Sequence, residues 1–164
     1  MSKGYVHLYT GNGKGKTTAA FGLAVRAAMA GKKVYIGQFV KDMQYSEVKI
    51  QEIVENIVIE QLGKGCFIYE SPDQKDIQAA LDGLEKCRQI LLSGEFDVVI
   101  LDEITIGLHF NLFTVDDVVK IIKNRDSKVE VVMTGRYAPE ALYEISDLVT
   151  EMKEIKHYYE TEGV

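Results

Sequence analysis

The sequence predicts a doubly wound α/β fold, in which helices cover both faces of a mainly parallel sheet. Two observations support this prediction. The chain opens with a β-favouring run, a glycine-rich segment and a long apolar helical stretch, and a second β-favouring run completes a βαβ unit. From there to the end, short strand-like runs alternate with helical patterns, which is the order typical of a parallel sheet with crossover helices.

The opening unit is a strand, a helix and a second strand. Residues 5–10 (YVHLYT) favour a strand, and residues 16–30 (KTTAAFGLAVRAAMA) are apolar around nearly the whole circumference of a helix, as expected of a buried one. Gly31 suits the left-handed residue that ends a helix. Residues 34–40 (VYIGQFV) then predict the second strand.

The middle of the chain predicts a short helix over 46–54 and a strand over 57–61. The following helix has a recognisable start and end. Ser71-Pro72-Asp73-Gln74 has the spacing of a capping box with proline at the first helical position, and apolar residues then recur at helical intervals until Gly94. A helix is therefore expected between these two signals.

The second half of the chain contains two strands that end in polar residues. Residues 96–101 (FDVVIL) form a mostly apolar run, typical of a strand covered on both faces, and deliver Asp102 and Glu103 to its carboxyl end. Residues 129–134 do the same for Gly135 and Arg136. The remaining predicted elements are a helix over 139–145 and a strand over 148–152.

Composition indicates one globular domain over residues 1–164, because 46% of the residues are hydrophobic and 27% charged. The net charge of −6, without a stripe of lysine and arginine, argues against a nucleic-acid partner. No apolar stretch is long enough to cross a bilayer and no signal peptide is recognisable, so we expect a cytoplasmic protein without a membrane partner. Cys66 and Cys87 lie far apart and predict neither a zinc site nor a disulfide.

The segment GNGKGKTT predicts a triphosphate site of the P-loop NTPase (RecA-like) kind. Glycines allow backbone N–H groups to surround an anion, Lys16 supplies a charge, and Thr17 offers a hydroxyl to the Mg²⁺ that accompanies a triphosphate. The usual GxxxxGK[ST] spacing would place a glycine at position 10, where this chain has Thr10. The residues expected to contact the phosphates of ATP are Gly11, Asn12, Gly13, Lys14, Gly15, Lys16, Thr17 and Thr18.

Two further strand ends are expected to contribute to the same site. In a doubly wound sheet, ligands bind beyond the carboxyl ends of the strands, where the glycine loop, the acidic pair and Arg136 would gather. Glu103 is a predicted Mg²⁺ ligand, and Asp102 would hold the ion directly or through water. The guanidinium of Arg136 suits phosphate oxygens. Each of these residues could instead be an ordinary charge at a strand end.

Several segments together resemble the P-loop-type ATP:corrinoid (cob(I)alamin or cob(I)yrinic acid a,c-diamide) adenosyltransferases. They occur in the order that the family shows: TGNGKGKTTAAFG from Thr10, QFVK from Gln38, LDEIT from Leu101, TGRYAPEAL from Thr134 and DLVTEMKEIKH from Asp147. The resemblance covers nearly the whole chain. It implies that Co(I) of a reduced corrinoid attacks the ribose 5′ carbon of ATP and expels inorganic triphosphate, with the nucleotide reversed across the loop relative to ordinary P-loop hydrolases.

The resemblance also implies roles for residues that no motif would single out. Phe67 and Tyr69 match an aromatic pair that packs on the lower corrin face in the family, although core packing explains them equally well from sequence alone. His157 matches a recurrent family position without a known role. The implied partners are ATP, a corrinoid, a flavoprotein reductase and a second copy of the chain in a homodimer.

Three other functions fit parts of the sequence. A RecA-like ATPase would use the glycine loop and Asp102-Glu103 equally well, and would produce ADP and phosphate. A nucleoside kinase sharing this core would usually carry a cysteine-rich zinc segment, which two distant cysteines cannot supply. A nucleotide-sensing module without catalysis is the remaining alternative.

Overall fold

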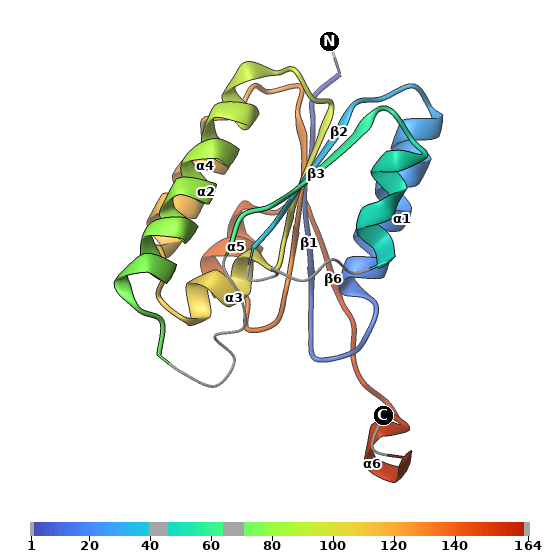
Figure 1. Cartoon of the computed structure of the whole chain (residues 1–164), viewed down its shortest axis with the longest axis vertical. Coiled ribbons are helices and arrows are strands. Elements are labelled where there is room, and N and C mark those ends of the chain that lie inside the picture. The colour runs from blue at the N-terminus through green and yellow to red at the C-terminus, as the bar shows by residue number, and fades with distance from the viewer. Residues whose placement is uncertain (1, 40–45, 64–70, 163–164) are drawn as a thin grey trace.

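The computed structural model describes residues 2–39, 46–63 and 71–162, which form a six-stranded sheet between two layers of helices (Figure 1). The strand order is β3-β2-β4-β5-β1-β6, and every pairing is parallel. The predicted α/β fold with a parallel sheet is thus confirmed. The strands are β1 (Val6–Thr10), β2 (Val34–Gln38), β3 (Ile57–Gln61), β4 (Val98–Asp102), β5 (Glu130–Thr134) and β6 (Leu148–Glu151).

Helices cover both faces of the sheet, with α1 on one side and α2 and α4 on the other (Figure 1). The short 3₁₀ helix η1 (Ser46–Glu52) lies on the α1 side, since its Val48 belongs to the same buried cluster. The α-helices are α1 (Lys16–Met29), α2 (Gln74–Ser93), α3 (Ile104–His109), α4 (Val115–Lys123), α5 (Glu140–Ile145) and α6 (Tyr159–Glu162).

The continuous apolar runs of the central strands follow from this double cover. In β4, Val98 and Ile100 pack in the cluster under α1, whereas Val99 and Leu101 pack in the cluster under α2 and α4. All five residues of β4 are buried. A strand buried on both faces therefore shows no alternation of polar and apolar residues.

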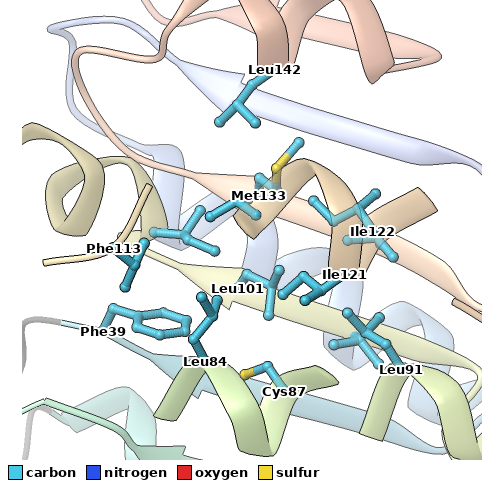
Figure 2. Close-up of a cluster of buried hydrophobic side chains, with 14 of the residues drawn as sticks. Phe39, Leu84, Cys87, Leu91, Leu101, Phe113, Ile121, Ile122, Met133 and Leu142 are labelled. Carbon is cyan, nitrogen blue, oxygen red and sulfur yellow. The ribbon is translucent and has the colours of Figure 1, made fainter. Parts of the chain in front are cut away.

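The larger core lies between the sheet and α2 to α5 (Figure 2). Leu91 of α2, Leu101 of β4 and Met133 of β5 have no exposed surface, and burial of each such side chain contributes roughly 1.5–3 kcal/mol to stability. Cys87 of α2 is also fully buried, and burial raises the pKa of its thiol to about 12. This thiol is therefore part of the core rather than a reactive group.

The start of α2 differs from the prediction by two residues. Asp73, not Ser71, is the N-cap, because the Asp73 carboxylate accepts a bond from the Asp76 amide and the Asp76 carboxylate accepts one from the Asp73 amide. The predicted box of Ser71 and Gln74 could not supply two carboxylate acceptors, which make the stronger hydrogen bonds to amides. The predicted end is confirmed, since Gly94 caps the helix in the left-handed conformation.

Three helices were not predicted: α3 and α4, which fill the stretch between β4 and β5, and the short α6. Thr114 and Asp117 form a complete capping box at the start of α4, and Val118, Ile121 and Ile122 are its buried residues. The sequence TVDD before this apolar series is the signal that could have predicted α4.

Candidate active site

The residues predicted to bind phosphates and Mg²⁺ lie at the carboxyl ends of β1, β4 and β5, which are neighbours in the sheet. The loop after β1 meets the end of β4 where the Thr17 hydroxyl donates to Asp102 Oδ1 over 2.9 Å. The loop meets the end of β5 at a cavity of about 400 Å³, which Gly11, Asn12 and Arg136 line together. The structure therefore brings the three predicted segments together at one edge.

The glycine loop turns through two left-handed glycines, Gly11 with φ 102° and Gly15 with φ 121°. Gly15 is the N-cap of α1 and has no side chain to occupy the first amides of the helix. Those amides and the helix dipole make this end of α1 electropositive, which suits a phosphate group.

Lys16 is buried, with 8% of its surface exposed, and its ammonium donates to the carbonyl of Gly13 over 2.7 Å. Burial is the largest influence on its pKa and lowers it, and the charge of Arg136 lowers it further. The carboxylate of Glu103 opposes both effects. Lys16 therefore lies within the electrostatic reach of Arg136 and Glu103, which follow β5 and β4.

The far side of the loop is covered by the chain that follows β6. The Gly13 amide donates to the Met152 carbonyl over 2.7 Å, and the Met152 amide donates to the Thr10 carbonyl over 2.8 Å. A Cβ atom at Gly11 or Gly13 would overlap the main chain of Met152. Close packing against the chain that follows β6 thus requires both glycines, independently of any phosphate.

Two other predicted phosphate contacts also touch this C-terminal segment. Asn12 Oδ1 accepts from the Glu154 amide over 3.3 Å, and the Lys14 ammonium donates to the Tyr158 hydroxyl over 3.4 Å. Thr18 is exposed on the first turn of α1. The phosphate contacts of all eight loop residues from Gly11 to Thr18, and of Arg136, remain predictions.

Asp102 is fully buried and accepts hydrogen bonds from three side chains. Thr17 and Thr134 donate to Oδ1 over 2.9 and 2.6 Å, and the Gln38 amide donates to Oδ2 over 3.2 Å. Gln38 and Thr134 were not predicted as site residues. Each is the last residue of its strand and a polar residue that follows apolar ones, which is the signal that could have identified it.

Glu103 has the left-handed backbone conformation, with φ 62° and ψ 22°. This conformation is uncommon for a residue with a side chain and typically occurs where the surroundings fix it. Here the Glu103 amide donates to the Thr134 hydroxyl over 3.0 Å, so that Thr134 contacts both members of the acidic pair.

Thr17, Asp102 and Glu103 are the predicted Mg²⁺ ligands, and hard oxygen donors of this kind suit Mg²⁺. Among the residues that the structure describes, no three histidine, cysteine, aspartate or glutamate side chains form a metal cluster by themselves. This sparse donor set fits an ion that obtains its other ligands from phosphates and water.

Phe67 and Tyr69, the predicted corrinoid contacts, lie outside the described residues. His157 lies in the segment before α6, where its Nδ1 accepts from the Tyr159 amide over 2.8 Å. None of the described helices is long and apolar enough to cross a membrane.

The fold and the site define an α/β protein with a parallel sheet and a glycine loop, with a lysine and a threonine at the start of α1 and a buried aspartate at the end of a neighbouring strand. The chain belongs to the ATP:corrinoid adenosyltransferase family BtuR/CobO/CobP, whose model matches residues 2–164. The family expectation from the sequence is thereby confirmed.

Curated relatives support this assignment over nearly the full chain. A corrinoid adenosyltransferase of Sinorhizobium sp. is 38% identical over an alignment of length 160, gaps included, that covers 94% of this chain and 74% of that protein. The corrinoid adenosyltransferase of Pseudomonas aeruginosa is 34% identical over 160 residues, 96% of this chain and 78% of that protein. The corrinoid adenosyltransferase of Escherichia coli K12 is 30% identical over 159 residues, 96% and 81% of the two chains.

Proposed function

We propose that this chain transfers the 5′-deoxyadenosyl group of ATP to the cobalt of a reduced corrinoid and releases inorganic triphosphate. The observation that carries the proposal is the family match over residues 2–164, on a chain whose glycine loop, acidic pair and Arg136 share one edge of the sheet. Co(I) of the substrate supplies the electron pair for the new cobalt–carbon bond. The C5′–O bond of ATP breaks, and its electron pair leaves with the triphosphate.

The residues of this site suit the stabilisation of a leaving group. Co(I) has no proton to lose, so the reaction needs no general base. Negative charge develops instead on the departing triphosphate, and Lys16 and Arg136 are the residues proposed to neutralise it, which their electrostatic proximity and the position of Arg136 beside the loop support. The buried position of Lys16 strengthens this effect, because a charge interacts more strongly where water is excluded.

Mg²⁺ bound with ATP would add a further positive charge at the phosphates. Thr17 and Glu103 are its proposed protein ligands. Asp102 already accepts hydrogen bonds from Thr17, Thr134 and Gln38, which supports an indirect role through Thr17 or a water molecule. Asp102 therefore holds the Thr17 hydroxyl in place at the start of α1.

The corrinoid side of the reaction rests on the family resemblance. Phe67 and Tyr69 are proposed to pack on the lower corrin face and displace its axial ligand, which would ease reduction to Co(I). Cobalamin and cobyrinic acid a,c-diamide are the two proposed substrates, and a flavoprotein is the proposed electron donor. A cytoplasmic homodimer is the proposed form of the protein.

Anaerobic reaction with cob(I)alamin and MgATP tests the proposal. The expected products are an adenosylated corrinoid, seen by its light-sensitive absorbance spectrum, and inorganic triphosphate in equal amount. Lys16→Ala should abolish both products and is the matched control. Formation of ADP and phosphate without an adenosylated corrinoid would instead identify an ATPase or kinase and overturn the proposal. Parallel reactions with the two corrinoids would show which one the enzyme prefers.

A further inference from the structure

Gly135 is enclosed between the ends of two other segments. Its φ of 141° lies in a region that residues with side chains rarely adopt, and a Cβ atom here would overlap the Thr105 hydroxyl. Thr105 is fully buried in α3, and its hydroxyl oxygen has no hydrogen-bond partner within the described ranges. Thr105 therefore closes one side of Gly135 by packing alone.

Strand β1 holds the other side of Gly135 through two consecutive residues. The Gly135 amide donates to the Tyr9 carbonyl over 3.1 Å, which extends the β1–β5 ladder by one residue. The Thr10 hydroxyl then donates to the Gly135 carbonyl over 2.9 Å. Thr10 is 2% exposed, so this bond is shielded from water. Both polar groups of the Gly135 backbone are thus fixed by the strand that leads into the glycine loop.

Arg136 follows Gly135 directly and faces the loop. It lines the same cavity as Thr10, Gly11 and Asn12, and its charge lowers the pKa of Lys16. The Gly135 carbonyl belongs to the peptide unit that continues into Arg136, so its direction sets where the Arg136 main chain begins. A hydrogen bond from Thr10 to this carbonyl therefore connects the start of the phosphate loop to the arginine.

We propose that Thr10 is a positioning residue, which holds Arg136 in register with the phosphate loop through the Gly135 carbonyl. The inference rests on the proposed function, in which Arg136 contacts the triphosphate. It also explains why this chain has threonine where the usual loop motif has glycine, because a glycine has no hydroxyl to donate. The bond joins residues that are 125 positions apart in the chain, so loop and arginine are linked by tertiary structure alone.

A double-mutant cycle on triphosphate binding tests the inference without requiring turnover. Calorimetry would compare inorganic triphosphate binding to the unchanged protein, Thr10→Val, Arg136→Gln and the double variant. Valine matches the shape of threonine but cannot donate, so Thr10→Val should weaken binding about five-fold, the scale of one neutral hydrogen bond. In the Arg136→Gln protein the same change should alter affinity by less than about two-fold, because the arginine to be positioned is gone.

Two further variants separate positioning from simple destabilisation. Thr10→Ser keeps the donor and should bind triphosphate within about two-fold of the unchanged protein. Thr10→Gly restores the usual motif but has no side-chain donor, so its affinity for triphosphate should resemble that of Thr10→Val. It replaces the valine variant if valine prevents folding. Thermal unfolding would confirm that each variant is folded.

Equal losses from Thr10→Val with and without Arg136 would overturn the inference, as would unchanged binding by Thr10→Val and Thr10→Gly. Failure of the unchanged protein to bind triphosphate would overturn it as well. Binding with the expected coupling, but without any adenosyl transfer, would leave the positioning role intact and overturn only the proposed function.

Discussion

The Thr17 hydroxyl donates to the carboxylate of Asp102 over 2.9 Å, and this bond joins the first turn of α1 to the end of β4. The bond connects Thr17, which is proposed to bind Mg²⁺, with the buried carboxylate of Asp102. This carboxylate also accepts hydrogen bonds from side chains on two further strands. The geometry of the ion site therefore depends on a network rather than on one ligand.

Replacement of Thr17 tests that dependence. Thr17→Val removes the proposed ligand and one donor to Asp102, so we expect at least a hundred-fold loss in triphosphate release, on the order of a lost transition-state contact. Loss of one donor to a buried carboxylate should also lower the free energy of unfolding by about 1–3 kcal/mol. Thr17→Ser keeps the hydroxyl and should retain most activity. Full activity of Thr17→Val at low Mg²⁺ concentration would remove Thr17 from the ion site.

The lowered pKa of Lys16 predicts that triphosphate binding takes up a proton at alkaline pH. The Lys16 ammonium loses its proton at a lower pH in the folded protein than in the unfolded chain. In the pH range just below 10.5, which is the ordinary pKa of lysine, the contribution of Lys16 to the free energy of unfolding therefore rises with pH. Bound triphosphate favours the charged form and raises the pKa again. Affinity should therefore fall as pH increases through that window.

Calorimetry in two buffers with different ionisation enthalpies would measure the proton uptake directly. Lys16→Arg stays protonated throughout this range and is the control, because any binding that it retains should involve no uptake. If the unchanged protein took up no proton on binding triphosphate, the Lys16 ammonium would not contact the triphosphate.

Gly13→Ala should damage the loop even though the residue is small. The added methyl group would come within 2.6 Å of the Met152 carbonyl oxygen, which is main chain and cannot turn away. We expect a loss of about 1–3 kcal/mol in the free energy of unfolding, typical of overpacking, together with weaker ATP binding. Chemical denaturation and calorimetry would measure the two effects.

Gly22→Ala is the matched control for that substitution. Gly22 lies on the exposed side of α1, and a Cβ atom there meets nothing within 4 Å. Alanine in a helix interior should stabilise the protein by about 0.5–1 kcal/mol and leave ATP binding unchanged. If Gly13→Ala behaved in the same way, the close packing of the loop against Met152 would be refuted.

Phe67→Ala tests the proposed corrinoid contact. If Phe67 displaces the axial ligand, its loss should slow the reaction that starts from Co(II) much more than the reaction that starts from chemically supplied Co(I). Both rates would be followed by the absorbance of the adenosylated product. Equal losses in the two reactions would indicate that Phe67 only packs in the protein.

The grouping of loop, acidic pair and Arg136 was predictable from sequence because the carboxyl ends of parallel strands share one edge of a sheet. The bonds between these groups were not. Thr10 and Gly135 lie 125 positions apart, and no local pattern shows that one hydroxyl would meet one carbonyl. The glycine at position 13 illustrates the same difficulty, because the loop motif predicts it as a phosphate contact, whereas the structure shows that packing against Met152 also requires a glycine there.

The packing of Met152 against the glycine loop also bears on how the protein is made. The loop follows β1, the first strand in chain order, but its Gly13 amide and the Thr10 carbonyl bond to Met152, which follows β6, the last strand of the sheet. A nascent chain can form the βαβ unit of β1, α1 and β2 early. The glycine loop can make its bonds to Met152 only after the residues beyond β6 have also left the ribosome.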